Sequence, residues 1–182
     1  MKHSSLENGR RALDWVQTRY LAWTAWGLLI ALFALLQGMP HAFEIAGARP
    51  LFLVPLVVGI ALFNGPIGGA AAGLAAGLLW DLYATHIYGF NGLLLMIIGC
   101  VAGLLIWLLI RNNWLTGSLL AAAAVFTQVL LEWLFCVAFA GADGAWRILW
   151  SCMLPNALYT ALLSPLFYWL TKAVMRFLRQ RF

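Results

Sequence analysis

Few side chains in this sequence are of the types that bind metals or act as nucleophiles. The three histidines and three cysteines are His3, His41, His86, Cys100, Cys136 and Cys152. The histidines lie far apart and form no HExxH or other paired spacing, and the cysteines form no CxxC pair. No serine lies in a GxSxG motif, and there is no P-loop. We therefore expect no enzymatic activity, no cofactor and no metal site.

Glu132 is an acidic residue that lies well inside a long apolar stretch. A charge at the centre of a bilayer costs about 2.5–3.5 kcal/mol, although the cost falls towards the interface. Gln128, four residues earlier on the same helical face, could share a hydrogen bond with it. Glu132 is therefore either an anchor for helix packing or a functional residue, and the sequence leaves both open.

Asp81 ends an apolar run and precedes the segment Gly89-Phe90-Asn91. An acid at the C-terminal end of a helix faces the negative end of the helix dipole, so Asp81 requires a specific partner. Loop amide groups or the Asn91 side chain could serve, while Asn91 could cap the following helix and Gly89 would permit an unusual backbone conformation. We favour a structured turn between two helices over a ligand site.

Four glycines recur every four residues, which places them on one face of a helix. They are Gly65, Gly69, Gly73 and Gly77. A face without side chains lets another helix approach closely, and such van der Waals contact drives association in lipid. We expect this glycine ladder to pack within the protein; the alternative is docking of a partner's transmembrane helix. Gly99 and Gly103 form a second, weaker pair.

The elements that position these residues must be membrane helices. The chain has 182 residues, of which 64% are hydrophobic and only 9% charged, too few to cover a soluble domain. The apolar runs are long and unbroken, unlike the short alternating segments of a β-barrel. The net charge of +5 lies at the segment ends, which indicates membrane topology rather than binding of nucleic acid. We expect an all-α integral membrane protein with the lipid bilayer as its solvent.

Charge-free stretches predict six transmembrane helices. Their ranges are 20–37, 50–63, 65–82, 91–110, 115–140 and 148–174. The second and third form one uncharged stretch, divided by the turn signal Asn64-Gly65-Pro66. We expect Pro155 and Pro165 to kink the sixth. The predicted organisation is a cytoplasmic segment 1–19, a six-helix domain 20–174 and a basic cytoplasmic tail 175–182.

The basic residues predict the orientation. With six crossings, nine of the eleven fall on one side, and only Arg49 and Arg147 fall on the other. The nine are Lys2, Arg10, Arg11, Arg19, Arg111, Lys172, Arg176, Arg179 and Arg181. Because basic residues concentrate in the cytoplasm, both termini are predicted to be cytoplasmic. The first apolar run lacks a nearby cleavage site, so we interpret it as a retained helix.

The glycine-rich helix, the pattern Gly77-Leu78-Leu79-x-Asp81 and then Gly89-x-Asn91-x-Leu93 resemble the rod shape-determining protein MreD family. The resemblance is most specific over residues 49–111 and implies a non-catalytic scaffold in the bacterial cytoplasmic membrane. The implied partners are an MreC-like single-span protein, an MreB-like filament and the glycosyltransferase–transpeptidase pair that builds the lateral cell wall. The family is also similar in fold to the substrate-binding subunits of energy-coupling-factor transporters.

Two other functions remain as alternatives. A small-solute, vitamin-type transporter subunit would require polar groups that converge near the middle of the membrane. The candidates are Glu132, Gln128, Thr127, Asn156 and Thr160, which form a sparse set. An intramembrane enzyme would require a nucleophile paired with a base, and the sequence offers no such pair.

Overall fold

The computed structural model describes residues 2–39, 48–84, 88–108, 113–139 and 144–180, and for residues 2–19, 179 and 180 it describes the backbone alone. The described residues are almost entirely helical, with no strand element among them, as predicted. The elements are α1 (Lys2–Gly38), α2 (Leu53–Asp81), α3 (Phe90–Leu108), α4 (Trp114–Glu132), α5 (Ala145–Ile148) and α6 (Leu154–Gln180). Two π-helical segments, η1 (Trp133–Ala138) and η2 (Leu149–Met153), continue α4 and precede α6.

The predicted break inside the long uncharged stretch is confirmed at Gly65. Its φ of 75° and ψ of −174° lie outside the helical region, and only glycine adopts this conformation readily. The following Pro66 has no amide hydrogen to donate, so it can begin the second half of α2. The halves then run close to one another, because a Cβ on Gly69 would lie 2.5 Å from the Cβ of Ala61.

The first half of α2 forms the centre of the bundle. Every residue from Leu53 to Leu62 is buried, and the segment contains no polar side chain. A helix that is apolar on all sides is expected to be surrounded by other elements. Trp26 and Ile30 of α1, Val125 of α4 and Phe167 of α6 belong to the same core.

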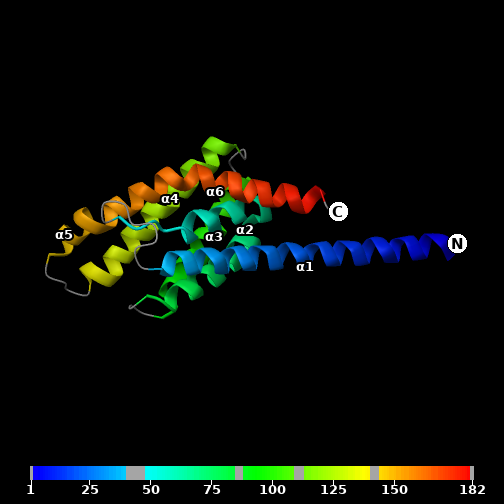
Figure 1. Cartoon of the computed structure of the whole chain (residues 1–182), viewed down its shortest axis with the longest axis horizontal. Coiled ribbons are helices and arrows are strands. Elements are labelled where there is room, and N and C mark those ends of the chain that lie inside the picture. The colour runs from blue at the N-terminus through cyan, green and yellow to red at the C-terminus, as the bar shows by residue number, and fades with distance from the viewer. Residues whose placement is uncertain (1, 40–47, 85–87, 109–112, 140–143, 181–182) are drawn as a thin grey trace.

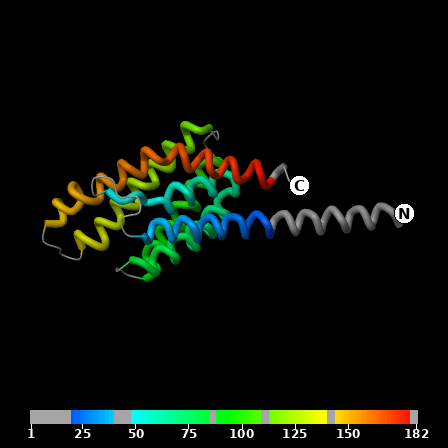
Figure 2. The backbone as a smooth tube through the Cα atoms, in the orientation of Figure 1, coloured from blue at the N-terminus to red at the C-terminus, as the bar shows by residue number. Residues whose placement is uncertain are grey.

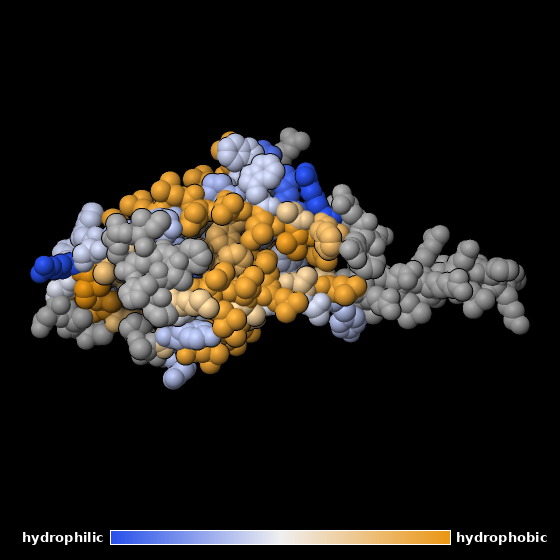
Figure 3. All heavy atoms as spheres, in the orientation of Figure 1, coloured by the Kyte–Doolittle hydropathy of each residue, from blue (hydrophilic) through white to orange (hydrophobic). Residues whose placement is uncertain are grey.

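The long helices run between two opposite ends of the bundle, where most of their ends lie (Figures 1 and 2). The last turns of α6 lie at one end, whereas the C-terminal end of α1, the start of α3 and α5 lie towards the other. The surface between these ends is largely apolar (Figure 3). Leu28, Leu119 and Leu162 are 73%, 72% and 80% exposed, as expected for side chains that face lipid.

Four helical segments are long and apolar enough to cross a membrane. They are Tyr20–Gly38, Leu53–Asp81, Phe90–Leu108 and Trp114–Ala138. Six crossings require the two halves of α2 to be counted separately and α6 to be added. The six-span topology and its orientation therefore stay predictions.

Several helix boundaries differ from the expected ones. α1 begins at Lys2 rather than near residue 20, and α6 extends to Gln180, beyond residue 174. Pro155 lies directly after the π-helical segment η2, in a helical stretch that is continuous from α5 to α6, and Pro165 lies inside α6. His41, His86 and the Arg111-Asn112 turn lie outside the described residues.

Candidate functional site

The glycine ladder of α2 packs directly against α3. A Cβ on Gly69 would overlap the carbonyl group of Gly99, and one on Gly73 would overlap that of Leu95. Gly77 meets the carbonyl group of Asn91 in the same way. Because the neighbouring atoms belong to the backbone, they cannot move aside as a flexible side chain would. The ladder therefore brings two helix backbones into contact, which is the packing that membrane helices favour.

The ladder continues to both ends of this contact. Gly103 of α3 lies against Gly65 and Pro66, so the weaker Gly99–Gly103 pair belongs to the same interface. Gly65 itself has no neighbour within 4 Å of an added Cβ, and its role is the turn described above. The face formed by Gly69, Gly73 and Gly77 is buried by α3, so it is not open to a partner helix in this structure.

Asp81 binds the first turn of α3 through both carboxylate oxygens. Oδ2 accepts from the amides of Gly89 and Gly92 at 2.9 and 3.2 Å. Oδ1 accepts from the backbone amide of Asn91 at 3.3 Å and from its Nδ2 at 3.0 Å. A helix N-terminus carries free amide groups and partial positive charge. A carboxylate there is therefore stabilised both by hydrogen bonds from these amides and by attraction to the helix dipole.

These contacts confirm the predicted link between Asp81 and Asn91 but change the assignment of the cap. We expected Asn91 to cap α3, whereas the structure places it inside the first turn and shows Asp81 accepting from the orphan amides. The two oxygens of a carboxylate can accept more hydrogen bonds than the single side-chain oxygen of an asparagine, so Asp81 is the better cap. Gly89 has a φ of 87°, so the turn uses the conformational freedom predicted for it.

A third residue, Gln128 of α4, joins this cluster. Its Nε2 donates to Asn91 Oδ1 at 2.9 Å, so Asp81, Asn91 and Gln128 link α2, α3 and α4. The three residues are 3%, 2% and 0% exposed. The carboxylate accepts only, which fixes the orientation of the Asn91 amide and then that of Gln128. Gln128 Oε1 consequently points away and has no hydrogen-bond partner among the described residues.

Sequence reasoning missed this arrangement because Asn91 and Gln128 are 37 residues apart. The predicted neighbour of Gln128 was Glu132, one helical turn along α4. Glu132 is half-buried and lies at the end of α4, directly before the π-helical segment η1. Whether Glu132 has a functional role stays a prediction.

A second set of polar contacts holds the chain where it enters α2. The amides of Arg49 and Leu51 donate to Asn156 Oδ1 and Thr160 Oγ1 of α6, at 2.7 and 2.9 Å. The amide of Leu53 donates to Oε1 of Gln37 on α1, at 3.1 Å. Backbone that is not helical can lie at membrane depth only where such partners replace water.

Four of the five residues considered for solute transport are thus engaged in internal contacts. Asn156 and Thr160 hold the start of α2, Gln128 holds Asn91, and Thr127 donates to the carbonyl of Ala123 at 2.8 Å. The described residues also contain no group of three side chains suited to a metal ion.

Comparison with known proteins gave one family. Searches among curated proteins and among solved structures gave no match. The family model of the rod shape-determining protein MreD matches residues 17–177, which include all of α2 to α5, both π-helical segments and nearly all of α6. The matched region contains the glycine ladder, the Asp81 turn and Gln128. Because this match covers most of the chain, the protein belongs to the MreD family of rod shape-determining proteins.

Proposed function

We propose that this protein is a non-catalytic scaffold of the machinery that elongates the bacterial cell wall, embedded in the cytoplasmic membrane. Membership of the MreD family, which acts in rod-shape determination, carries the proposal. The use of the buried polar residues supports it, because Asp81, Asn91 and Gln128 hold three helices together. A rigid bundle with an apolar exterior is suited to positioning other membrane proteins.

The proposed topology has six crossings and two cytoplasmic termini. It is supported by the separate halves of α2, by the nine basic residues on the proposed inner side, and by the start of α1 and the end of α6, which lie on the same side of the bundle (Figure 1). Single cysteines Asn112→Cys and Lys172→Cys in a cysteine-free background should be protected from an impermeant thiol reagent in intact cells. Asp143→Cys should react. Labelling of Lys172→Cys from outside would reject the topology.

The proposed partners are an MreC-like single-span protein, an MreB-like filament and the glycosyltransferase–transpeptidase pair. Because the glycine ladder packs on α3, a partner would bind the protein at a different surface, one that faces the lipid. Each of α1, α3 and α4 has exposed leucines that a partner helix could cover.

Depletion in a rod-shaped host tests the function. We expect rounded cells, because lateral wall synthesis would no longer be localised, and we expect uptake of vitamins to be unchanged. Pull-down in mild detergent followed by mass spectrometry should recover the MreC-like protein. Cells that stay rod-shaped but lose vitamin uptake would reject the scaffold and favour a transporter subunit.

A further inference from the structure

A cavity of about 180 Å³ lies where α1 ends and where the chain enters and leaves α2. Two of the residues that line it, Ala34 and Leu53, are buried and belong to the hydrophobic core. The other large side chains in the lining are polar or aromatic, and they come from all three segments: Gln37, Arg49, Trp80 and Tyr83. The cavity therefore joins the core to side chains that can bind a polar group.

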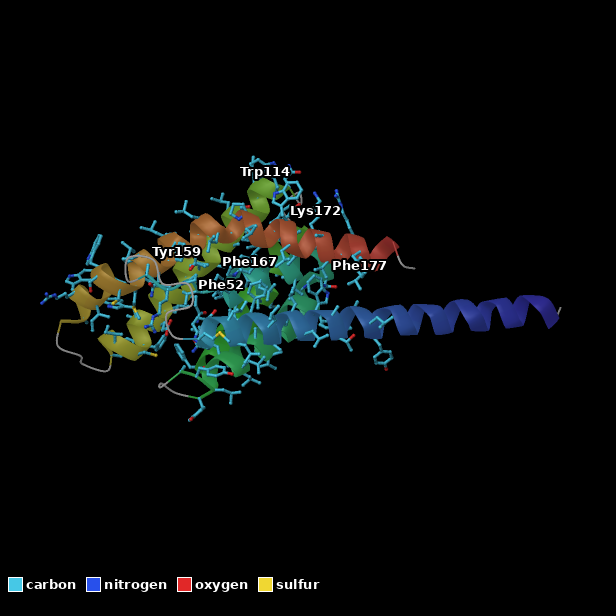
Figure 4. All side chains as sticks on the ribbon, in the orientation of Figure 1. Phe52, Trp114, Tyr159, Phe167, Lys172 and Phe177 are labelled. Carbon is cyan, nitrogen blue, oxygen red and sulfur yellow. The ribbon has the colours of Figure 1, made fainter. Side chains whose placement is uncertain are left out.

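The segment that carries Arg49 is held from both sides. The amide of Arg49 donates to Asn156 Oδ1 of α6 at 2.7 Å, and the amide of Leu53 donates to Gln37 Oε1 of α1 at 3.1 Å. Between them, Phe52 packs against phenyl rings of α1 and α6, with centroid distances of 5.8 and 5.9 Å (Figure 4). The backbone at Arg49 is therefore in place before any ligand binds.

Trp80 and Tyr83 form the aromatic side of the cavity at the end of α2. The amide of Tyr83 donates to the carbonyl of Trp80 at 3.0 Å, which extends the last helical turn. The Tyr83 ring packs on Gly38 of α1, where an added Cβ would lie 3.4 Å from the ring. Trp80 is half-buried and packs against the core. Both rings are thus positioned by contacts within the bundle.

The polar side chains of the lining offer donors. Arg49 has five N–H groups and no acceptor, so it can bind a ligand while it keeps other contacts. Gln37 uses its side-chain oxygen for the amide of Leu53, which leaves the two Nε2 hydrogens. The indole of Trp80 can only donate. No carboxylate is present among the described lining residues. Such donors around one full positive charge suit a phosphate or carboxylate, which a guanidinium binds through two parallel hydrogen bonds.

The size of the cavity and its position limit the ligand and its affinity. A cavity of about 150 Å³ holds one benzene ring, so this cavity of about 180 Å³ holds one small oxyanion group. The C-terminal ends of α1 and α2 lie beside it and carry partial negative charge. This charge stabilises Arg49 in the empty cavity and opposes an anion, so we expect binding in the millimolar range.

We propose that this cavity binds a single phosphate or carboxylate group through the guanidinium of Arg49 and the Nε2 group of Gln37. The site is a ligand-binding function separate from the scaffold role. In the proposed topology this end of the bundle is the outer one, so the oxyanion is either dissolved on the outer side or carried by a lipid head group. The binding itself does not depend on the topology.

Fluorine NMR of the full chain in maltoside micelles, labelled with 5-fluorotryptophan, tests the site because Trp80 lines the cavity. Trp80→Phe and Trp146→Phe assign two resonances by their loss. Sodium phosphate or sodium acetate, exchanged for sodium chloride at constant ionic strength, should shift the Trp80 resonance until it saturates. Trp146 lies beside Arg147, an exposed arginine outside the cavity, and should show no saturable shift.

Gln37→Glu is the most specific variant. It keeps an oxygen for the amide of Leu53, but it replaces the two Nε2 hydrogens with a negative charge. The Trp80 shift should therefore be lost although the helices stay in place. Melting in the absence of phosphate should be close to that of the unchanged protein, which separates loss of binding from loss of the fold.

Variants of arginine supply the matched comparison. Arg49→Gln should weaken phosphate binding about tenfold or more, because a charged hydrogen-bond donor is lost. Arg49→Lys should weaken it less, since it keeps the charge but not the paired donors. Arg147→Gln removes the same group outside the cavity and should bind as the unchanged protein does.

Dihexanoyl-phosphatidylglycerol distinguishes the two sources of the oxyanion. If it binds more tightly than inorganic phosphate in the same titration, the site takes a lipid head group; if it binds more weakly, the site takes a dissolved anion.

Three results would overturn the proposal: a Trp80 resonance that does not respond, equal affinity in Arg49→Gln, or the same saturable response at Trp146. The titration does not involve cell shape, so its outcome is independent of the depletion experiment that tests the scaffold.

Discussion

The pair α2–α3 and the pair α1–α6 use opposite kinds of packing. In α2–α3, glycine faces backbone carbonyl groups, and a carboxylate fixes the turn between the helices. Between α1 and α6, large aromatic and leucine side chains face one another across a hollow. Burial also differs: in an 18-residue stretch of each helix, 67% of the residues of α2 and 39% of those of α3 are buried, against 17% of those of α1.

This difference separates what fixes the fold from what can adapt. Contacts between backbones leave no atoms that can move aside, so they specify one arrangement. Contacts between leucines and aromatic rings can repack around an added group at small cost. We therefore expect substitutions between α2 and α3 to destabilise the protein far more than substitutions between α1 and α6. Four substitutions test this division, from the largest expected effect to the smallest.

Gly73→Leu should have the largest effect, above about 4 kcal/mol, because its side chain would enter the backbone of α3 at Leu95. The variant should be lost from the membrane fraction by immunoblot, and a rod-shaped host should become round. Gly27→Leu is the control, because a Cβ at Gly27 meets nothing within 4 Å. Normal abundance of Gly73→Leu, with loss of the MreC-like protein on co-purification, would instead identify the ladder as a docking face.

Asp81→Ala should destabilise the protein by about 3 kcal/mol, because four donors lose a buried acceptor. Asn91→Ala should also destabilise it. The double variant should cost less than the sum of the two, since both remove one shared hydrogen bond. Melting in detergent measures the effect, and strict additivity would show that the two residues act independently.

Gln128→Leu should cost about 1 kcal/mol. It leaves Asn91 Oδ1 without its donor, but it also removes the buried and unpartnered Gln128 Oε1, so the two effects partly offset one another. Gln128→Glu should cost more, because the carboxylate offers Asn91 no donor unless it is protonated. If Gln128→Leu proved as damaging as Asp81→Ala, the cluster would depend on α4 far more than its single bond suggests.

Leu163→Ala should have the smallest effect, below about 1 kcal/mol, because Leu163 already borders a hollow and the deletion only enlarges it. Leu95→Ala removes the same atoms from a fully buried position and should cost about 2–5 kcal/mol. Equal losses in a denaturation series would remove the distinction between the two helix pairs.

Features with local signals were predictable from the sequence. Asn64-Gly65-Pro66 marks a turn by its own chemistry, and the break is at Gly65. The four-residue spacing of the glycines places them on one helical face, and no information about the rest of the chain is needed for this inference. The unfavourable position of Asp81 required a nearby partner, and Asn91 was the polar side chain within reach.

Features that depend on distant parts of the chain were not predictable. Gln128 pairs with Asn91 because α4 passes the start of α3, and Glu132 was preferred only because it is near in sequence. The same holds for Asn156 and Thr160, whose partners are backbone amides more than a hundred residues away. The hollow between α1 and α6 has no sequence signal, since its lining is indistinguishable from ordinary core leucine and phenylalanine.

The Gly65 turn has a consequence for the membrane itself. At about 1.5 Å per residue, the half of α2 over residues 66–81 is about 24 Å long, shorter than a hydrocarbon core of about 30 Å. Ile67 and Leu78 on this half are 84% and 48% exposed, so in the six-pass topology this short half faces lipid. In that topology the bilayer would thin beside it, at a cost of a fraction of a kcal/mol per Å of mismatch, whereas the longer helices would impose no such thinning. Neighbouring proteins with similarly short spans would relieve this deformation by lying beside α2, so the surrounding lipid would attract them without any specific contact.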